Sequence, residues 1–195
     1  VERHLISREH AAKNVGSGVV INERETISVM INEEDHLRIQ FIRCCLRLQE
    51  AFEGANHLDD LISERVAYAF SPRYGYLTAC PTNAGTGLRA SVLIHLPALV
   101  LLDEIQRVLK SIMQVGLSVR GLYGEHSEVM GNLFQVSNQI SMGITEEDII
   151  DNIERITNQL ISREDATRKM LLTKNKAGLF DRVSRAAGTL KSAHI

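Results

Sequence analysis

The 195-residue chain carries 22 Lys and Arg residues against 24 Asp and Glu, a formal net charge of −2 at pH 7. Such a balance excludes a general attraction to nucleic acid or to an anionic membrane, so an anion site would have to be a local cluster of arginines. Three cysteines without C-x-x-C spacing indicate neither a disulfide framework nor a zinc site, which favours a reducing cytoplasm. The longest apolar run, residues 92–102, is too short to span a bilayer.

The first half of the chain predicts strands followed by a helix. Residues 17–21 and 25–31 form two strands, the second with Ile27, Val29 and Ile31 on its inward face. After residues 32–40 an apolar stripe at helical spacing predicts a long helix, with members Phe41, Cys45, Leu48, Phe52, Ala55, Ile62 and Val66. The chain begins without methionine inside a strand-like segment, so we expect it to belong to a longer protein.

The second half adds strands and then a helical tail. Segments 74–79, 88–96, 117–121 and 132–138 are strand-like, and residues 97–114 predict one helix with Pro97 in its first turn. A Thr145 cap with an acidic first turn begins a helix over 143–171, and residues 179–190 continue helically. This order predicts an α+β fold, an antiparallel sheet flanked by helices, with a helical C-terminal tail.

The stretch CPTNAGTGLRAS, residues 80–91, contains a glycine pattern of the form G-x-G-x-x-A. A dinucleotide fingerprint needs a helix after these glycines and an acidic residue beyond the next strand. Here a strand follows the glycines, and the nearest acids, Asp103 and Glu104, belong to a helix. No Gly-Lys-Ser/Thr follows, so a Walker A loop is excluded as well.

Charged side chains elsewhere have two interpretations. Glu34 in NEEDH and Glu125 in GEHSE are each most simply solvated loop carboxylates, and Arg38, Arg89 and Arg120 surface cations. If strands bring the three arginines together, their guanidinium groups form a clamp for a polyphosphate.

Cys80 also has two interpretations. It is either a small buried hydrophobe or a thiolate that pairs with a cationic substrate group, and composition does not choose between them. Gly85 and Gly87 would let the backbone approach a ligand closely.

Three segments, NEEDHLR, CPTNAGTGLRASV and VRGLYGEHSE, together resemble the guanidino phosphotransferase family in order and spacing. The resemblance implies that family's C-terminal catalytic domain, an antiparallel sheet flanked by helices, over residues 1–144. Residues 145–195 would then be a truncated helical extension. The family's N-terminal segment, with an SSRIR-like loop, is absent from this chain, so we expect the chain alone to bind nucleotide weakly or to be inactive.

The resemblance also implies roles for individual residues. Glu34 and Glu125 would hold the substrate guanidinium, with Cys80 beside it. ATP would be bound by His4, Arg38, Arg89, Ala90, Ser91, Val92, Leu93, Arg120, Gly121, Leu122, Tyr123, Gly124 and Glu125. Mg²⁺ would be held mainly by phosphates and water, so no dedicated protein metal site is expected.

Within the family, the chain looks most like the bacterial protein-arginine kinases. Leu93 stands where phosphagen kinases usually have histidine, and about fifty further residues follow GITEEDI. This branch implies ATP-dependent phosphorylation of arginine side chains in a stress response, with a repressor and chaperone–protease components as protein partners. The alternatives are a small-molecule guanidino kinase and a non-catalytic adaptor. The apolar stripe of the tail fits an intramolecular core or a homodimer equally well.

Overall fold

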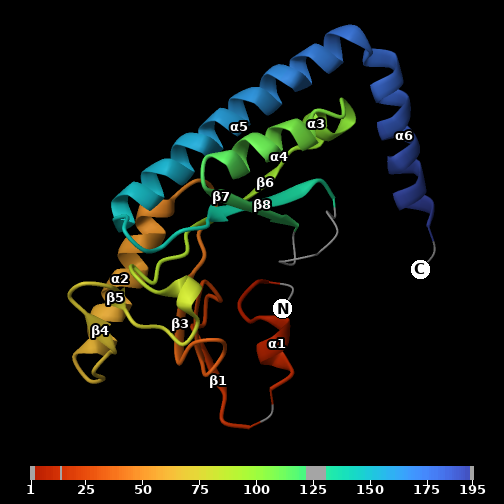
Figure 1. Ribbon diagram of the computed structural model, residues 1–195. Helices are drawn as coiled ribbons and strands as arrows, with labels where there is room; N and C mark the ends of the chain where they lie inside the picture. Colours follow the sequence, from red (N-terminus) through yellow and green to blue (C-terminus); the bar gives the residue numbers. More distant parts are fainter. Residues whose placement is uncertain (1–2, 14, 122–130, 194–195) are drawn as a thin grey trace. The chain divides into compact units, whose positions relative to one another are not determined.

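The computed structural model describes residues 3–13, 15–121 and 131–193 (Figure 1). The chain forms two compact units. The first comprises Val1–Val92, Gly116–Ser118 and Val136–Glu154, and the second comprises Leu93–Val115, Val119–Gln135 and Arg155–Ile195. The division that we predicted between residues 144 and 145 stays a prediction.

The first unit contains an antiparallel sheet of order β1-β2-β3, which follows the short helix α1 (Arg8–Ala11). Its strands are β1 (Gly18–Ile21), β2 (Ile27–Ile31) and β3 (Leu37–Phe41). Ile27 and Val29, on the predicted face of β2, are half-buried, but the opposite face is buried more deeply. Ser28 and Met30 are the buried residues, at 0% and 1% exposure, whereas Ile31 on the other face is 38% exposed.

Strand β3 was not predicted, and it ends at Phe41, the first member of the predicted helical stripe. Leu37, Ile39 and Phe41 alternate along β3 and lie opposite Ile31, Val29 and Ile27 of β2. The helix α2 (Leu48–Ser63) begins only afterwards. It packs against β3 at Gly54, where an added Cβ would lie 2.5 Å from Phe41 Cε1. Phe41 therefore belongs to both patterns, and pairing with β2 decides for the strand.

The described residues contain two further sheets. Strands β4 (Phe70–Ser71) and β5 (Gly75–Tyr76) form a short antiparallel hairpin. Strands β6 (Ser91–His95), β7 (Leu117–Gly121) and β8 (Leu133–Asn138) form a sheet of order β6-β8-β7, with Phe134 and Val136 of the central strand buried. The predicted strands 117–121 and 132–138 are confirmed, and so is the α+β class.

The predicted helix 97–114 is two helices, α3 (Pro97–Leu101) and α4 (Ile105–Gln114). The break falls at Asp103, whose φ of +56° is left-handed and cannot continue an α-helix. Helix α4 buries Ile105, Val108 and Ile112, which are spaced to share one helix face.

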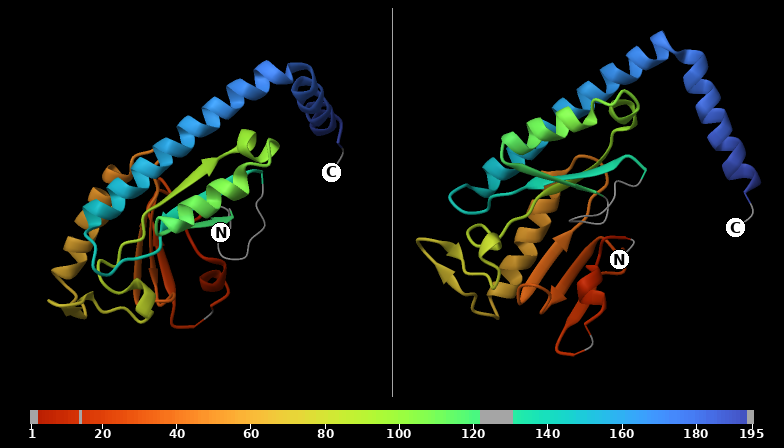
Figure 2. Two further views of the ribbon diagram at one scale, coloured as in Figure 1. Left: turned by 45° about the horizontal axis from the view of Figure 1, so that its top comes forward. Right: turned by 45° about the vertical axis from the view of Figure 1, so that its right-hand side comes forward.

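The C-terminal tail consists of α5 (Glu146–Lys174) and α6 (Lys176–Ser192). The Thr145 hydroxyl accepts a hydrogen bond from the Asp148 amide at 3.1 Å, as the sequence predicts. Within the second unit, α6 leaves the direction of α5 (Figure 2). The side chain of Asn175, between the two helices, caps α6 by accepting a hydrogen bond from Gly178 N. None of the described helices is long and apolar enough to cross a membrane.

Candidate active site

The loop 32–36 joins β2 to β3 and carries three consecutive acidic residues. Asn32 has a left-handed φ of +57°, and its amide donates to the His36 carbonyl at 2.9 Å, which closes the hairpin. Because the strand ends at Ile31, strand alternation does not orient the acids. Their contacts do: Glu33 and Asp35 are half-buried, whereas Glu34 is exposed.

Glu33 turns toward the N-terminal segment and toward Arg38. Its carboxylate accepts from Ser7 Oγ at 2.6 Å and from the Glu34 amide at 2.9 Å, and it lies 3.4 Å from Arg38 Nη1. Burial alone would raise the pKa of Glu33, but these hydrogen bonds and the Arg38 charge outweigh it and hold the pKa below 4.5. Glu33 is therefore a charged structural partner of Arg38.

Cys80 lies at the start of a 3₁₀ turn, η1 (Pro81–Asn83). The Cys80 amide donates to Asp35 Oδ1 at 3.0 Å, although 45 residues separate the two in sequence. The Cys80 Sγ lies 3.0 Å from Thr82 Oγ1, and the Thr78 hydroxyl donates to the Cys80 carbonyl at 2.6 Å. The half-buried thiol thus has a fixed backbone and a hydroxyl neighbour.

Asn83 connects the Cys80 turn to both neighbouring carboxylates. Its Nδ2 donates to Asp35 Oδ2 at 2.7 Å and lies 3.4 Å from Glu34 Oε2. The structure therefore brings Glu34 and Cys80, both candidate catalytic residues, to one place in the first unit. Their catalytic roles stay predictions.

Gly85 serves the packing of the loop itself. Its φ is +105°, and an added Cβ would lie 2.2 Å from the Ser141 carbonyl oxygen. The buried Ser141 also donates through its hydroxyl to the carbonyls of Thr82 and Ala84, at 3.1 and 2.8 Å. We expected Gly85 to let the backbone approach a ligand closely, but at Gly85 it is the main chain of Ser141 that lies close.

Asn138 positions the predicted nucleotide segment 89–93. Its Oδ1 accepts from Ala90 N at 2.9 Å, and its Nδ2 donates to the Leu88 carbonyl at 2.9 Å. Arg89 is exposed, with Nη2 3.4 Å from Ser137 Oγ. Beyond buried Ala90, the residues Ser91 and Val92 are half-buried and Leu93 is exposed on β6.

The other predicted ATP-binding residues are spread over the chain. His4 is exposed, and its carbonyl accepts from the Gln40 side chain. Arg120 is half-buried near the end of β7, and Gly121 after it is buried. Leu122, Tyr123, Gly124 and the second predicted carboxylate, Glu125, lie outside the described residues.

Sequence reasoning missed the residues that hold this site together: Asp35, Asn83, Asn138 and Ser141. Asp35 and Asn83 belong to the motifs NEEDH and CPTN, which also contain predicted site residues. Their position in these motifs could have indicated that they belong to the site. Asn138 and Ser141 act through main-chain contacts about 50 residues away in sequence, and no local pattern marks such contacts.

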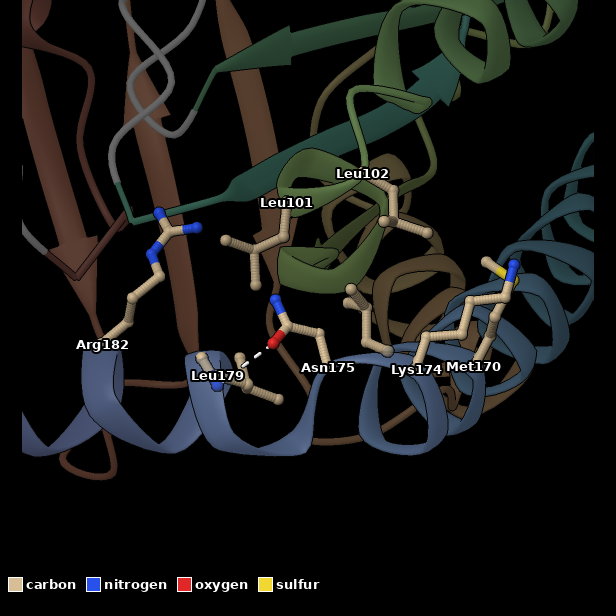
Figure 3. A pocket seen from close by; sticks show the side chains of 9 residues that line it. Leu101, Leu102, Met170, Lys174, Asn175, Leu179 and Arg182 are labelled. Carbon is tan, nitrogen blue, oxygen red and sulfur yellow. Dashed lines mark hydrogen bonds between the residues drawn. The ribbon is translucent and has the colours of Figure 1, made fainter.

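A pocket of about 250 Å³ lies elsewhere, within the second unit (Figure 3). Leucines and Met170 line it, with Lys174 and Arg182 at its edge. None of the predicted site residues lines this pocket.

Comparison with known proteins identifies the family. Residues 1–167 match the sequence model described as ATP:guanido phosphotransferase, C-terminal catalytic domain. The chain belongs to the ATP:guanido phosphotransferase family.

Relatives of this ATP:guanido phosphotransferase chain are known from bacteria. It is 53% identical over 194 residues to a protein-arginine kinase of Halothermothrix orenii, covering 100% of this chain and 56% of that protein. It is 48% identical over 195 residues to the protein-arginine kinase of Clostridium acetobutylicum, covering 100% and 57%. The chain thus spans about half the length of the curated relatives that it matches.

Solved structures share the fold. A lombricine kinase matches with a TM-score of 0.74 at 26% identity, over 86% of this chain and 50% of that one. The duplicated taurocyamine kinase of Schistosoma mansoni, with bound transition state analog components, matches with a TM-score of 0.71 at 30% identity. That match covers 80% of this chain and 22% of the larger protein.

Proposed function

We propose that this chain is the catalytic part of an ATP-dependent protein-arginine kinase, which transfers the γ-phosphoryl group of ATP to arginine side chains of proteins. The observation that carries the proposal is the identity of about half, over the whole chain, to relatives named protein-arginine kinase. The closeness of Glu34 to the Cys80 turn, which Asn83 bridges, supports it, because a guanidinium substrate needs acceptor groups at one place.

The reaction requires a guanidinium group to become a nucleophile. Its pKa lies above about 12, so in water it stays protonated and attacks poorly. Glu34 is an exposed carboxylate that would hold the guanidinium plane and accept a proton as the N–P bond forms. The Cys80 thiol would face the same group, and Glu125 would be the second carboxylate.

The phosphate side of the reaction would use arginines. Arg38, Arg89 and Arg120 would neutralise the charge of the phosphates as the γ-phosphoryl group passes through a loose transition state. Mg²⁺ would arrive with ATP, bound mainly by phosphate oxygens and water. Across residues 3–13, 15–121 and 131–193, no three His, Cys, Asp or Glu side chains are grouped to hold a metal ion.

We place this activity in the bacterial cytoplasm, in the stress response that the family resemblance implies. A repressor and components of a chaperone–protease system are the proposed protein partners, and a homodimer is the proposed assembly. These proposals rest on the resemblance to the protein-arginine kinase branch.

The test compares two acceptors for the protein as its gene encodes it. With Mg-ATP, we expect acid-labile phosphate on arginine residues of an arginine-containing protein such as casein. Labelling of free arginine alone would instead indicate a small-molecule guanidino kinase. Full function in a Glu34→Gln, Glu125→Gln double variant would indicate a non-catalytic adaptor.

A further inference from the structure

We propose that Asp35 is a positioning residue for the phosphotransfer site: it fixes the Cys80 turn against the loop that carries Glu34. The proposal rests on the proposed function, since Glu34 and Cys80 matter together only if both face a substrate guanidinium. Asp35 itself acts through Cys80 and Asn83.

Both oxygens of the Asp35 carboxylate are used. Oδ1 accepts from the Cys80 main-chain amide at 3.0 Å, and Oδ2 accepts from Asn83 Nδ2 at 2.7 Å. The two donors are the residue just before η1 and its last residue, so one carboxylate contacts both ends of the turn. Hydrogen bonds to a charged, half-buried acceptor are stronger than neutral ones.

These bonds fix the direction of the Cys80 side chain relative to Glu34. A tethered amide nitrogen limits rotation of the Cys80 backbone, and Thr82 Oγ1 lies 3.0 Å from the thiol sulfur on the same turn. Asn83 Nδ2 spans both carboxylates, at 2.7 Å from Asp35 and 3.4 Å from Glu34. Asp35 thereby sets the spacing between the two groups that would grip the guanidinium.

Two carbonyls of the turn and of the residue after it have a second, independent partner. Ser141 Oγ donates to the carbonyls of Thr82 and Ala84. Loss of the Asp35 bonds would therefore loosen the Cys80 end of the turn while the Ser141 end stays attached. The expected effect is local movement at the thiol.

The first experiment measures alkylation of Cys80 by iodoacetamide. Cys44 and Cys45, both exposed, are changed to serine in every variant so that only Cys80 reacts. The rate is read on its high-pH plateau, where the thiol is ionised and accessibility limits the reaction. Asp35→Ala should raise this rate about fivefold or more, and Asp35→Asn, which can keep one of the two bonds, should raise it less.

Asp59→Asn is the matched control. Asp59 is also half-buried in the first unit and also accepts a side-chain hydrogen bond, from Tyr76 Oη at 3.1 Å. Its change should leave the Cys80 rate within about twofold. Equal rates for the Asp35 variants, Asp59→Asn and the parent would overturn the proposal. If Asp35→Ala does not fold, the Cys80 alkylation rate of Asp35→Asn, compared with that of the parent, decides.

The second experiment separates positioning from general damage. In the protein as its gene encodes it, Asp35→Asn should raise KM for the guanidino substrate and lower kcat, with the dissociation constant of MgADP unchanged. An equal loss of MgADP affinity would indicate a merely structural role and overturn the proposal. A parent protein without kinase activity would refute the proposed function, yet the alkylation rates would still decide the role of Asp35.

Discussion

Arg38 Nη1 lies 3.4 Å from Glu33 Oε2, so an arginine that we propose for ATP phosphates also has a carboxylate partner within the chain. Glu33 is held from the other side by the Ser7 hydroxyl and the Glu34 amide. Its pKa is lowered: burial opposes the shift, but the hydrogen bonds and Arg38 prevail, so Glu33 is charged at neutral pH. Phosphate and Glu33 would therefore compete for Arg38.

Glu33→Gln should tighten MgADP binding, because it removes this competing charge. The Arg38 side chain is 43% exposed and the Glu33 side chain 9%, so solvent still weakens the pair; at about 1 kcal/mol, the upper end for exposed pairs, the gain would be about fivefold. Titration calorimetry on the protein as its gene encodes it would measure it. Glu23→Gln, an exposed residue of the same unit, controls for net charge. Weaker binding in Glu33→Gln would mean that Glu33 orients Arg38 for the nucleotide.

Glu34→Gln should lower kcat for arginine phosphorylation by about 100-fold or more, the usual cost of removing a general base. Glutamine keeps the shape and the contact with Asn83 but cannot take the proton. Phosphoarginine formation with Mg-ATP is the measurement, and unchanged MgADP affinity would show an intact fold. The exposed helix residue Glu53 offers a control as Glu53→Gln. Activity close to the parent in Glu34→Gln would contradict the assigned role.

Glu164→Gln should destabilise the second unit. The carboxylate is 3% exposed and accepts from the amides of Ala98 and Leu99, at 2.8 and 3.1 Å, in the first turn of α3. Glutamine removes the negative charge and places its own N–H group opposite one of the two main-chain N–H donors. The free energy of unfolding should therefore fall by about 1–3 kcal/mol. Urea unfolding would measure it. Arg168 pairs with both Glu164 and the exposed Asp165, so Asp165→Asn is the control and should change the unfolding free energy by less than about 0.5 kcal/mol.

Gly85→Ala should destabilise the loop that follows Cys80. The φ of +105° is unfavourable for alanine, and the new Cβ would lie 2.2 Å from the Ser141 oxygen. Backbone must move to relieve that contact, so we expect a loss of at least about 2 kcal/mol in unfolding free energy. In contrast, Gly188→Ala in α6 meets nothing within 4 Å and should stabilise its helix by up to about 1 kcal/mol. Equal melting temperatures for the two variants would contradict this account.

The sequence predicts the fold where one local pattern dominates. Residues 117–121 alternate without a competing helical stripe, and the Thr145 cap with an acidic first turn begins a helix that the structure contains. Prediction failed where the structure of a segment depends on the segment that it pairs with. Phe41 fits both a helical stripe and a strand, and only pairing with Ile27 selects the strand. The break at Asp103 depends on a single left-handed residue that no glycine or proline announces.

The residues of the candidate site could likewise be predicted where a local motif contains them, but not where contacts between distant loops decide. Glu34, Cys80 and Arg89 stand in specific motifs, so the sequence could name them. The hydrogen bonds that join these motifs come from Asp35, Asn83, Asn138 and Ser141, and they depend on which loops meet. Side chains that bind distant main-chain groups leave no periodic signal in the sequence.

Alkaline unfolding should report on Tyr76. Burial, together with Asp59, raises the pKa of the Tyr76 hydroxyl from 10.0 to about 12. Between pH 10 and 12 the folded chain keeps this proton while the unfolded chain loses it. The contribution of Tyr76 to the free energy of unfolding is therefore fully present below pH 10 and is lost as the pH rises from 10 to 12. In urea unfolding across this window, Tyr76→Phe should show a shallower decline in stability than the parent. Tyr74→Phe, at an exposed position of the same hairpin, should keep the parent's slope, and a parent slope in Tyr76→Phe as well would exclude Tyr76 as the titrating group.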